Sequence, residues 1–119
     1  MQAEELRDFV VNALEDMKAL DINVLDVRGR TAITDFIIVA SGTSERHVKA
    51  TAESVAFKAK QAGNASIGEE GVKEGEWALV DLNGVVLHVM QARVRDYYQI
   101  EKLWELDPAS AEKRRNDHA

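Results

Sequence analysis

The side chains that could carry acid–base or metal chemistry in this chain of 119 residues are its three histidines and a nearby carboxylate. His47, His88 and His118 fall in a predicted helix, a predicted strand and the C-terminal segment, without the close spacing of a zinc site. His88 and Asp81 lie on one predicted hairpin and could act as acid and base, but such pairs are more often structural. We therefore expect no catalytic residue and no metal site.

The segment from Ser41 to Ser44, Ser-Gly-Thr-Ser, could hold a phosphate because it joins a predicted strand to the start of a predicted helix. It has neither the lysine and spacing of a P-loop nor the three glycines of a dinucleotide-binding loop. Nucleotidyl transfer would also need paired carboxylates to hold Mg²⁺, and Asp81 stands alone in its strand. No cofactor is expected, and a nucleotide-binding enzyme stays as the alternative.

The hydrophobic pattern indicates which helices position these residues. Apolar side chains recur every three or four positions over residues 3–20 and 43–63, which predicts two amphipathic helices. Thr43 or Ser44 can cap the second of them. A third helix is predicted over residues 94–106, where the single proline follows.

The strands alternate with these helices. Residues 21–28 have strand character, and residues 36–40 form an unbroken apolar run typical of a strand covered on both faces. Residues 64–75, which contain glycines and carboxylates, are predicted to form a mobile loop. With the hairpin below, the pattern predicts an α/β (α+β) domain: a small mixed sheet with helices on one main face.

The strongest local signal is a hairpin over residues 77–91. Asn83-Gly84 predicts a two-residue turn of type I′, because both turn positions need positive φ. This turn makes one face aliphatic, with Ala78, Val80, Leu82, Val85, Leu87 and Val89. The other face carries Trp77, Leu79, Asp81, Val86, His88 and Met90. Three helices cannot easily cover both faces, so we expect the second face to be open and to serve as a docking patch, although Trp77 and Met90 could be ordinary core residues.

Composition limits the class of partner. The chain carries 15 Lys and Arg against 21 Asp and Glu, a formal charge of −6, which argues against direct nucleic-acid binding as the main source of affinity. A basic protein partner fits this charge, and so does simple solubility. The absence of cysteine excludes disulfides and thiolate catalysis.

Length and segment composition predict one domain over residues 1–107 and a charged, flexible tail over residues 108–119. No apolar run approaches the length of a membrane span. The N-terminus carries acidic residues where a secretory signal would need positive charge. We therefore expect a cytoplasmic protein that does not bind membranes.

Several blocks of the sequence match a known pattern together: Asp21 to Val27, Thr34 to Val48, Glu70-Gly71, Trp77 to Met90, and Arg95 to Trp104. In these blocks the chain resembles the ribosomal silencing factor family, RsfS, also called Iojap-like. The resemblance implies a nucleotidyltransferase-like domain without the catalytic carboxylates. It also implies docking on the fourteenth protein of the large ribosomal subunit, which would block joining of the small subunit and slow translation when nutrients are scarce.

The same resemblance implies partner contacts on the hairpin and the last helix, at Trp77, Leu82, Met90, Tyr98, Asp81, His88 and Arg95. The contact at Leu82 conflicts with the hairpin register, which puts this residue on the core face. The resemblance implies no enzyme activity. A role in large-subunit assembly would use the same docking, and the free chain could form a homodimer.

Overall fold

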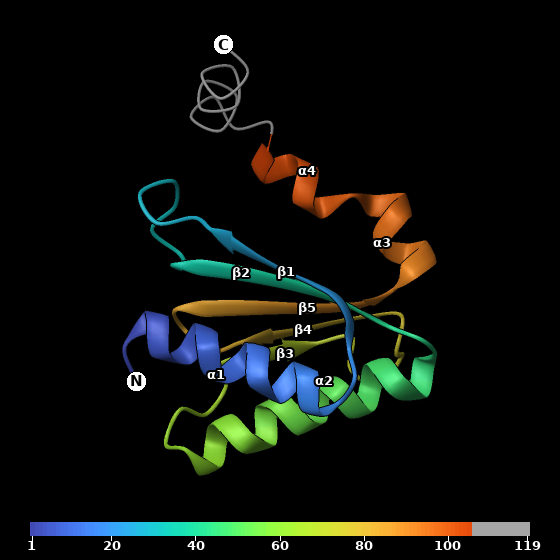
Figure 1. Cartoon of the computed structure of the whole chain (residues 1–119), viewed down its shortest axis with the longest axis horizontal. Coiled ribbons are helices and arrows are strands. Elements are labelled where there is room, and N and C mark those ends of the chain that lie inside the picture. Colours follow the sequence, from blue (N-terminus) through green and yellow to red (C-terminus); the bar gives the residue numbers. More distant parts are fainter. Residues whose placement is uncertain (106–119) are drawn as a thin grey trace.

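A computed structural model of the chain describes residues 1–105 (Figure 1). Its elements are α1 (Ala3–Asp16), β1 (Leu20–Asp26), β2 (Phe36–Gly42), α2 (Glu45–Gln61), β3 (Gly68–Glu70), β4 (Trp77–Asp81), β5 (Val85–Gln91), α3 (Ala92–Tyr98) and α4 (Ile100–Glu105). None of the helices in this part of the chain is long and apolar enough to span a membrane. The predicted domain end at residue 107 and the predicted tail over residues 108–119 lie outside the described residues.

The strands form one five-stranded sheet in the order β1-β2-β5-β4-β3. β2 and β5 are parallel and the other neighbouring pairs are antiparallel, which confirms the predicted α/β class with a mixed sheet. α1 and α2 lie on one side of the sheet, and α3 and α4 on the other (Figure 1). Because it is covered from both sides, every residue of β2 is buried, as the apolar run predicted.

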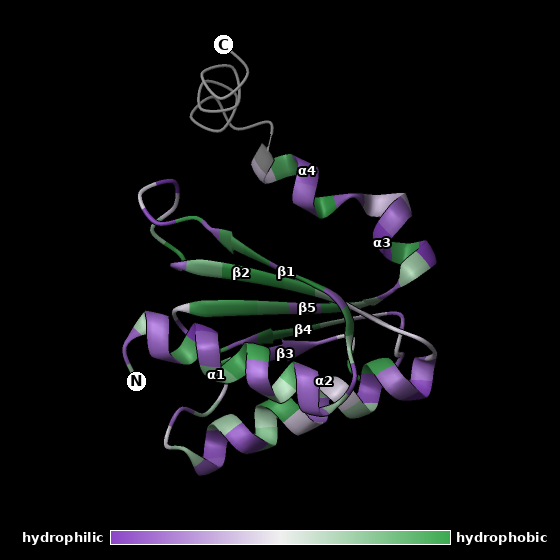
Figure 2. Ribbon diagram, in the orientation of Figure 1, coloured by the Kyte–Doolittle hydropathy of each residue, from purple (hydrophilic) through white to green (hydrophobic). Residues whose placement is uncertain are grey.

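The main core lies between the sheet and the helices α1 and α2. Its large, fully buried side chains come from both helices, from β2 and β5, and from the position after β4; they include Leu6, Leu14, Val48, Val55, Phe36, Ile38, Leu82 and Leu87. Figure 2 shows β2 and β5 as mainly hydrophobic strands and the helices with mixed faces. Each such side chain stabilises the fold by about 1.5–3 kcal/mol, so the central strands are the fixed frame of the molecule.

The start of α2 is fixed by a cap and by His47. The N–H of His47 donates to Ser44 Oγ at 3.0 Å, which confirms the predicted cap. The His47 ring also accepts from the N–H of Thr43 at Nδ1 and donates from Nε2 to the carbonyl of Met17, just beyond α1, at 2.7 Å. Both ring nitrogens are thus used within the fold, and His47 is a structural residue that joins α1 to α2.

β4 and β5 form the predicted hairpin with the predicted register. Trp77 pairs with Met90, and Leu79 pairs with His88. The turn residues Asn83 and Gly84 have φ values of 56° and 123°, positive as the predicted turn requires. The sequence pattern therefore fixed which side chains share each face.

Two expectations for the second half of the chain are wrong. The predicted loop over residues 64–75 contains β3, an edge strand that pairs with β4. The single helix predicted over residues 94–106 is two helices, because Gln99 has a left-handed backbone with φ of 48°. Hydrophobic spacing does not report such a break, since α4 resumes the helical pattern at once in a new direction (Figure 1).

Candidate functional site

The second sheet face is only partly open. α3 and α4 pack over its centre, where Ile37, Val39, Met90 and Val94 form a second, smaller core. The rest of this face, on β4 and β5, carries side chains that stay half-buried: Trp77, Leu79, Asp81, Val86 and His88. The open face expected from the sequence is thus confined to the β4–β5 hairpin, beside the end of α3.

An aromatic cluster, defined here as Trp77, His88, Tyr97 and Tyr98, occupies the boundary between this open face and α3. The Trp77 ring centroid lies 5.9 Å from that of His88 and 4.9 Å from that of Tyr98. The Tyr97 and Tyr98 rings meet edge to face at 5.0 Å. Tyr98 is 55% exposed and Tyr97 is 81% exposed. Three elements, β4, β5 and α3, therefore bring these rings together while leaving the tyrosines exposed to solvent.

Trp77 and His88 are also joined by a hydrogen bond. The indole Nε1–H donates to Nδ1 of His88 at 2.9 Å. The two residues are diagonal neighbours on one face of the hairpin, because Trp77 is opposite Met90 and His88 is opposite Leu79. Since the indole can only donate, the proton of the neutral imidazole lies on Nε2.

The environment of His88 opposes a catalytic role. Burial lowers the pKa of His88 from 6.5 to about 4, so the imidazole is a weak base at neutral pH. The Asp81 carboxylate accepts from the backbone N–H of Asn83 at 2.9 Å and so supports the turn. The acid–base pair considered from the sequence is replaced by two separate structural contacts.

Two predicted partner contacts are corrected by their burial. Leu82 and Met90 are both 0% exposed. Leu82 lies on the aliphatic hairpin face in the main core, as the register required, and Met90 lies under α3 and α4. A partner on the surface of the free chain cannot reach either side chain, so both support the site from beneath.

Arg95 is also turned inward. Its Nε donates to Glu101 Oε1 at 2.7 Å, and its Nη1 donates to Ser41 Oγ at 2.9 Å and to the carbonyl of Asp21 at 2.8 Å. Its side chain is only 14% exposed. The family resemblance suggested a partner contact here, but the guanidinium is engaged with three other elements of its own chain.

Tyr97 is a site residue that the predicted partner contacts did not include. Like Tyr98 and Leu103, it is exposed. Adjacent residues on a helix point about 100° apart, so two neighbouring tyrosines could not both face the sheet. The adjacency of the two tyrosines in the sequence therefore indicates that at least one of them is exposed.

The alternative phosphate site between Ser41 and Ser44 has its key groups occupied. The N–H of Thr43 donates to Nδ1 of His47, and the N–H of His47 donates to Ser44 Oγ. A Cβ on Gly42 would sit 2.6 Å from Cγ2 of Val48, so the loop is packed tightly on α2. Within residues 1–105, no group of three or more His, Asp or Glu side chains could hold a metal ion.

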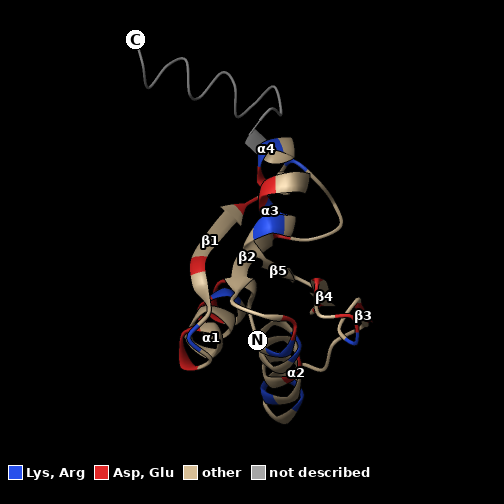
Figure 3. Ribbon diagram, turned by 90° about the vertical axis from the view of Figure 1, so that its right-hand side faces the viewer, with Lys and Arg blue, Asp and Glu red and all other residues tan. Residues whose placement is uncertain are grey.

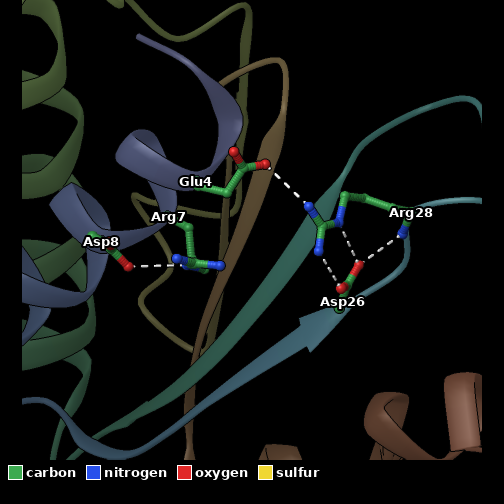
Figure 4. A network of polar contacts seen from close by, with 5 residues as sticks. All are labelled: Glu4, Arg7, Asp8, Asp26 and Arg28. Atoms are coloured by element: carbon green, nitrogen blue, oxygen red, sulfur yellow. Dashed lines mark hydrogen bonds and ion pairs between the residues drawn. The ribbon is translucent and has the colours of Figure 1, made fainter.

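Charged residues are distributed over the surface. Figure 3 shows acidic and basic residues interspersed along α2 and α3. At the other end of the sheet, Arg28 pairs with Asp26 and Glu4 (Figure 4). Its guanidinium also lies over the Phe36 ring. The bond from Arg28 lowers the pKa of Asp26 to about 2. This network ties the loop after β1 to α1, away from the aromatic cluster.

Comparisons with known proteins agree on one family. A family model described as "Ribosomal silencing factor during starvation" matches residues 1–119. A protein of Chromobacterium violaceum named "Ribosomal silencing factor RsfS" is 49% identical over 87% of this chain and 85% of its own length. A crystal structure of a protein from Chromobacterium violaceum, also 49% identical, superposes with a TM-score of 0.85 over 87% of each chain.

A mouse relative has a different name. "Mitochondrial assembly of ribosomal large subunit protein 1" of Mus musculus is 33% identical over 83% of this chain and 45% of its own length. The fold and the sequence matches point the same way. The chain belongs to the ribosomal silencing factor family.

Proposed function

We propose that this chain represses translation by binding the large ribosomal subunit through its fourteenth protein, so that the small subunit cannot join when nutrients are limited. The observation that carries the proposal is the aromatic cluster, whose two tyrosines are exposed beside a partly open sheet face in a member of this family. We expect the chain to act in the cytoplasm, to need little direct contact with nucleic acid, and to catalyse no reaction.

The aromatic cluster has the physical properties of an interface centre. Trp and Tyr are enriched among the residues that dominate binding energy, because they bury large apolar areas and keep a polar group at the edge. Here Tyr98 is held against Trp77, and Trp77 is bonded to His88, before any partner arrives. Pre-ordered rings lose little conformational entropy on binding, which favours affinity.

The charge of the chain supports a basic protein as the partner. A formal charge of −6 attracts a basic surface over distance and raises the rate of encounter. The contact itself would be made by the aromatic rings and the half-buried apolar residues Leu79 and Val86. Occupancy is then the whole mechanism, because a domain on the joining face leaves no room for the small subunit.

Sedimentation tests the proposal directly. The purified chain is mixed with large subunits, and small subunits are then added. We expect the chain to migrate with free large subunits and to reduce subunit joining. Tyr97→Glu and Trp77→Glu should abolish both effects, because a carboxylate in the interface would be buried without a partner.

The matched control is Phe57→Glu. Phe57 is 60% exposed on α2, on the other side of the sheet, so this variant makes the same kind of change away from the cluster. It should bind as the unchanged chain does. The proposal fails if the unchanged chain does not migrate with large subunits, or if joining proceeds equally well in its presence.

A second candidate function is assistance in large-subunit assembly. The name of the mouse relative favours it, and the same docking surface would serve. Profiles of precursor subunits in cells lacking the protein separate the two functions: accumulated precursors indicate assembly, and normal precursors with excess joining during starvation indicate silencing. The homodimer considered for the free chain stays a prediction, which sedimentation equilibrium of the purified chain would test.

A further inference from the structure

Arg95 makes contacts that reach far beyond its own helix. From α3 it donates to the carbonyl of Asp21 in β1, to Ser41 in β2 and to Glu101 in α4. Glu101 in turn accepts from Nδ2 of Asn23 in β1. The bond from Arg95 is the main cause that lowers the pKa of Glu101. One partly buried ion pair therefore links four elements.

Of the two helices joined by this pair, α3 has few other anchors, whereas Ile100 and Trp104 of α4 also pack against the second core. α3 has seven residues, and Val94 is the only one of them that is buried. Isolated helices of this length are unstable, so α3 depends on tertiary contacts. The left-handed residue Gln99 separates α3 from α4, and the Arg95–Glu101 pair spans that break.

The tyrosines of the aromatic cluster follow directly from this anchor. Tyr97 and Tyr98 lie two and three positions after Arg95, in the last turn before the break. Tyr98 stands 4.9 Å from Trp77, centroid to centroid, only while α3 keeps its position against the sheet. Trp77 and His88, by contrast, lie on the hairpin, whose strands pair with each other without α3.

We propose that Arg95 is a positioning residue of the docking surface: by bonding Asp21, Ser41 and Glu101 it clasps α3 and α4 to the sheet and so holds Tyr97 and Tyr98 beside Trp77. This inference rests on the proposed function, since it gives Arg95 a role in the same surface. It replaces the direct partner contact suggested by the resemblance. A guanidinium with three internal partners and 14% exposure has little left to offer a partner.

The variant Glu101→Ala separates a clasp from a direct contact. It leaves Arg95 in place but removes the carboxylate that spans the break. If Arg95 acts as a clasp, binding to isolated large subunits should weaken about five- to tenfold, a loss in the range of a charge-assisted contact. If Arg95 touches the partner, freeing it from Glu101 should leave binding unchanged or strengthen it, and that result overturns the inference.

A mutant cycle that combines Arg95 with the two tyrosines tests whether Arg95 affects binding through them. Arg95→Met should weaken binding by about tenfold in the unchanged chain. In a chain that already carries Tyr97→Ala and Tyr98→Ala it should have almost no further effect, because the rings that Arg95 positions are gone. Equal losses in both backgrounds would contradict the inference. Arg95→Lys, which keeps a cation and a donor, should recover part of the affinity.

Hydrogen exchange gives a readout that needs no ribosome. In free Glu101→Ala, the amides of α3 and α4 should exchange faster, while those of β4 and β5 keep their protection. The control is Arg93→Met on the same helix, which removes the ion pair between Arg93 and Glu76. Because these two side chains are 66% and 55% exposed, the variant should change the exchange rates little. If Glu101→Ala exchanges its α3 and α4 amides as slowly as the original chain, the positioning role of Arg95 is refuted, even if the original chain binds large subunits. If the original chain does not bind large subunits, the proposed function is refuted instead, and Arg95 then has no docking surface to position.

Discussion

The indole N–H of Trp77 donates to Nδ1 of His88 at 2.9 Å, across the β4–β5 hairpin and on its half-open face. This bond orders the central ring of the aromatic cluster and fixes the protonation state of its polar neighbour, because Nδ1 can accept only while it carries no proton. Binding and pH dependence are therefore linked through one pair of side chains.

Acid should destabilise the fold through His88. Its pKa is about 4 in the folded chain against an ordinary value of 6.5, so the unfolded chain binds more protons between these values. Stability is then at its maximum above pH 6.5 and is lost progressively as the pH falls toward 4, by up to about 3 kcal/mol. Urea unfolding at pH 7.5, 6 and 5 measures this loss.

The control for the pH effect is His88→Gln, whose amide oxygen can still accept from Trp77 but does not titrate. Its stability should change much less between pH 7.5 and 5. The lowered pKa values of Asp26 and Glu101 act only at more acidic pH, because the ordinary values of these groups are 3.8 and 4.5. An equal loss in both proteins would show that another group is responsible.

Replacement of Trp77 by Phe should destabilise the chain by about 1–2 kcal/mol, since it leaves Nδ1 of His88 without its donor in a mostly buried site. A double-mutant cycle with His88→Phe isolates the bond, and we expect a coupling of about 1 kcal/mol from urea unfolding at pH 7.5. Additive losses would mean that the hydrogen bond contributes nothing to the stability of the hairpin.

The hairpin register could be predicted because Asn83-Gly84 allows one turn geometry and a period of two then assigns every side chain to a face. The packing of α3 and α4 over the second face could not be predicted, because it depends on the left-handed residue Gln99, which hydrophobic spacing does not indicate. For the same reason the sequence left open whether Met90 is a core residue or part of the docking patch, and the structure buries it. For Leu82 the hairpin register correctly predicted burial in the core, whereas the family resemblance suggested a partner contact.

The corrected role of Met90 predicts a contrast with Tyr97. Met90→Leu keeps the volume of a buried side chain, so it should cost less than about 1.5 kcal/mol and leave binding to large subunits unchanged. Tyr97→Ala removes a ring that is 81% exposed, so stability should change by less than about 0.5 kcal/mol while binding weakens strongly. Thermal unfolding and sedimentation of both variants check this; loss of binding in stable Met90→Leu would restore Met90 as a contact.

Three glycines make a graded test of how the loop before β4 holds Trp77. Gly68 has open space around it and no positive φ, so Gly68→Ala should be nearly neutral. Gly63 has open space and φ of +83°, so Gly63→Ala should cost about 1 kcal/mol from the backbone conformation alone.

Gly71 combines φ of +71° with a backbone contact, because an added Cβ would overlap the carbonyl oxygen of Trp77. Relief of that overlap requires the loop or the start of β4 to move, and rigid backbone cannot give way as a side chain tip can. Gly71→Ala should therefore cost about 3 kcal/mol or more, and in the folded fraction it should weaken binding because the indole is displaced. Urea unfolding of the three variants, followed by sedimentation with large subunits, gives the order; if Gly71→Ala is no more harmful than Gly63→Ala, the loop does not set the position of Trp77.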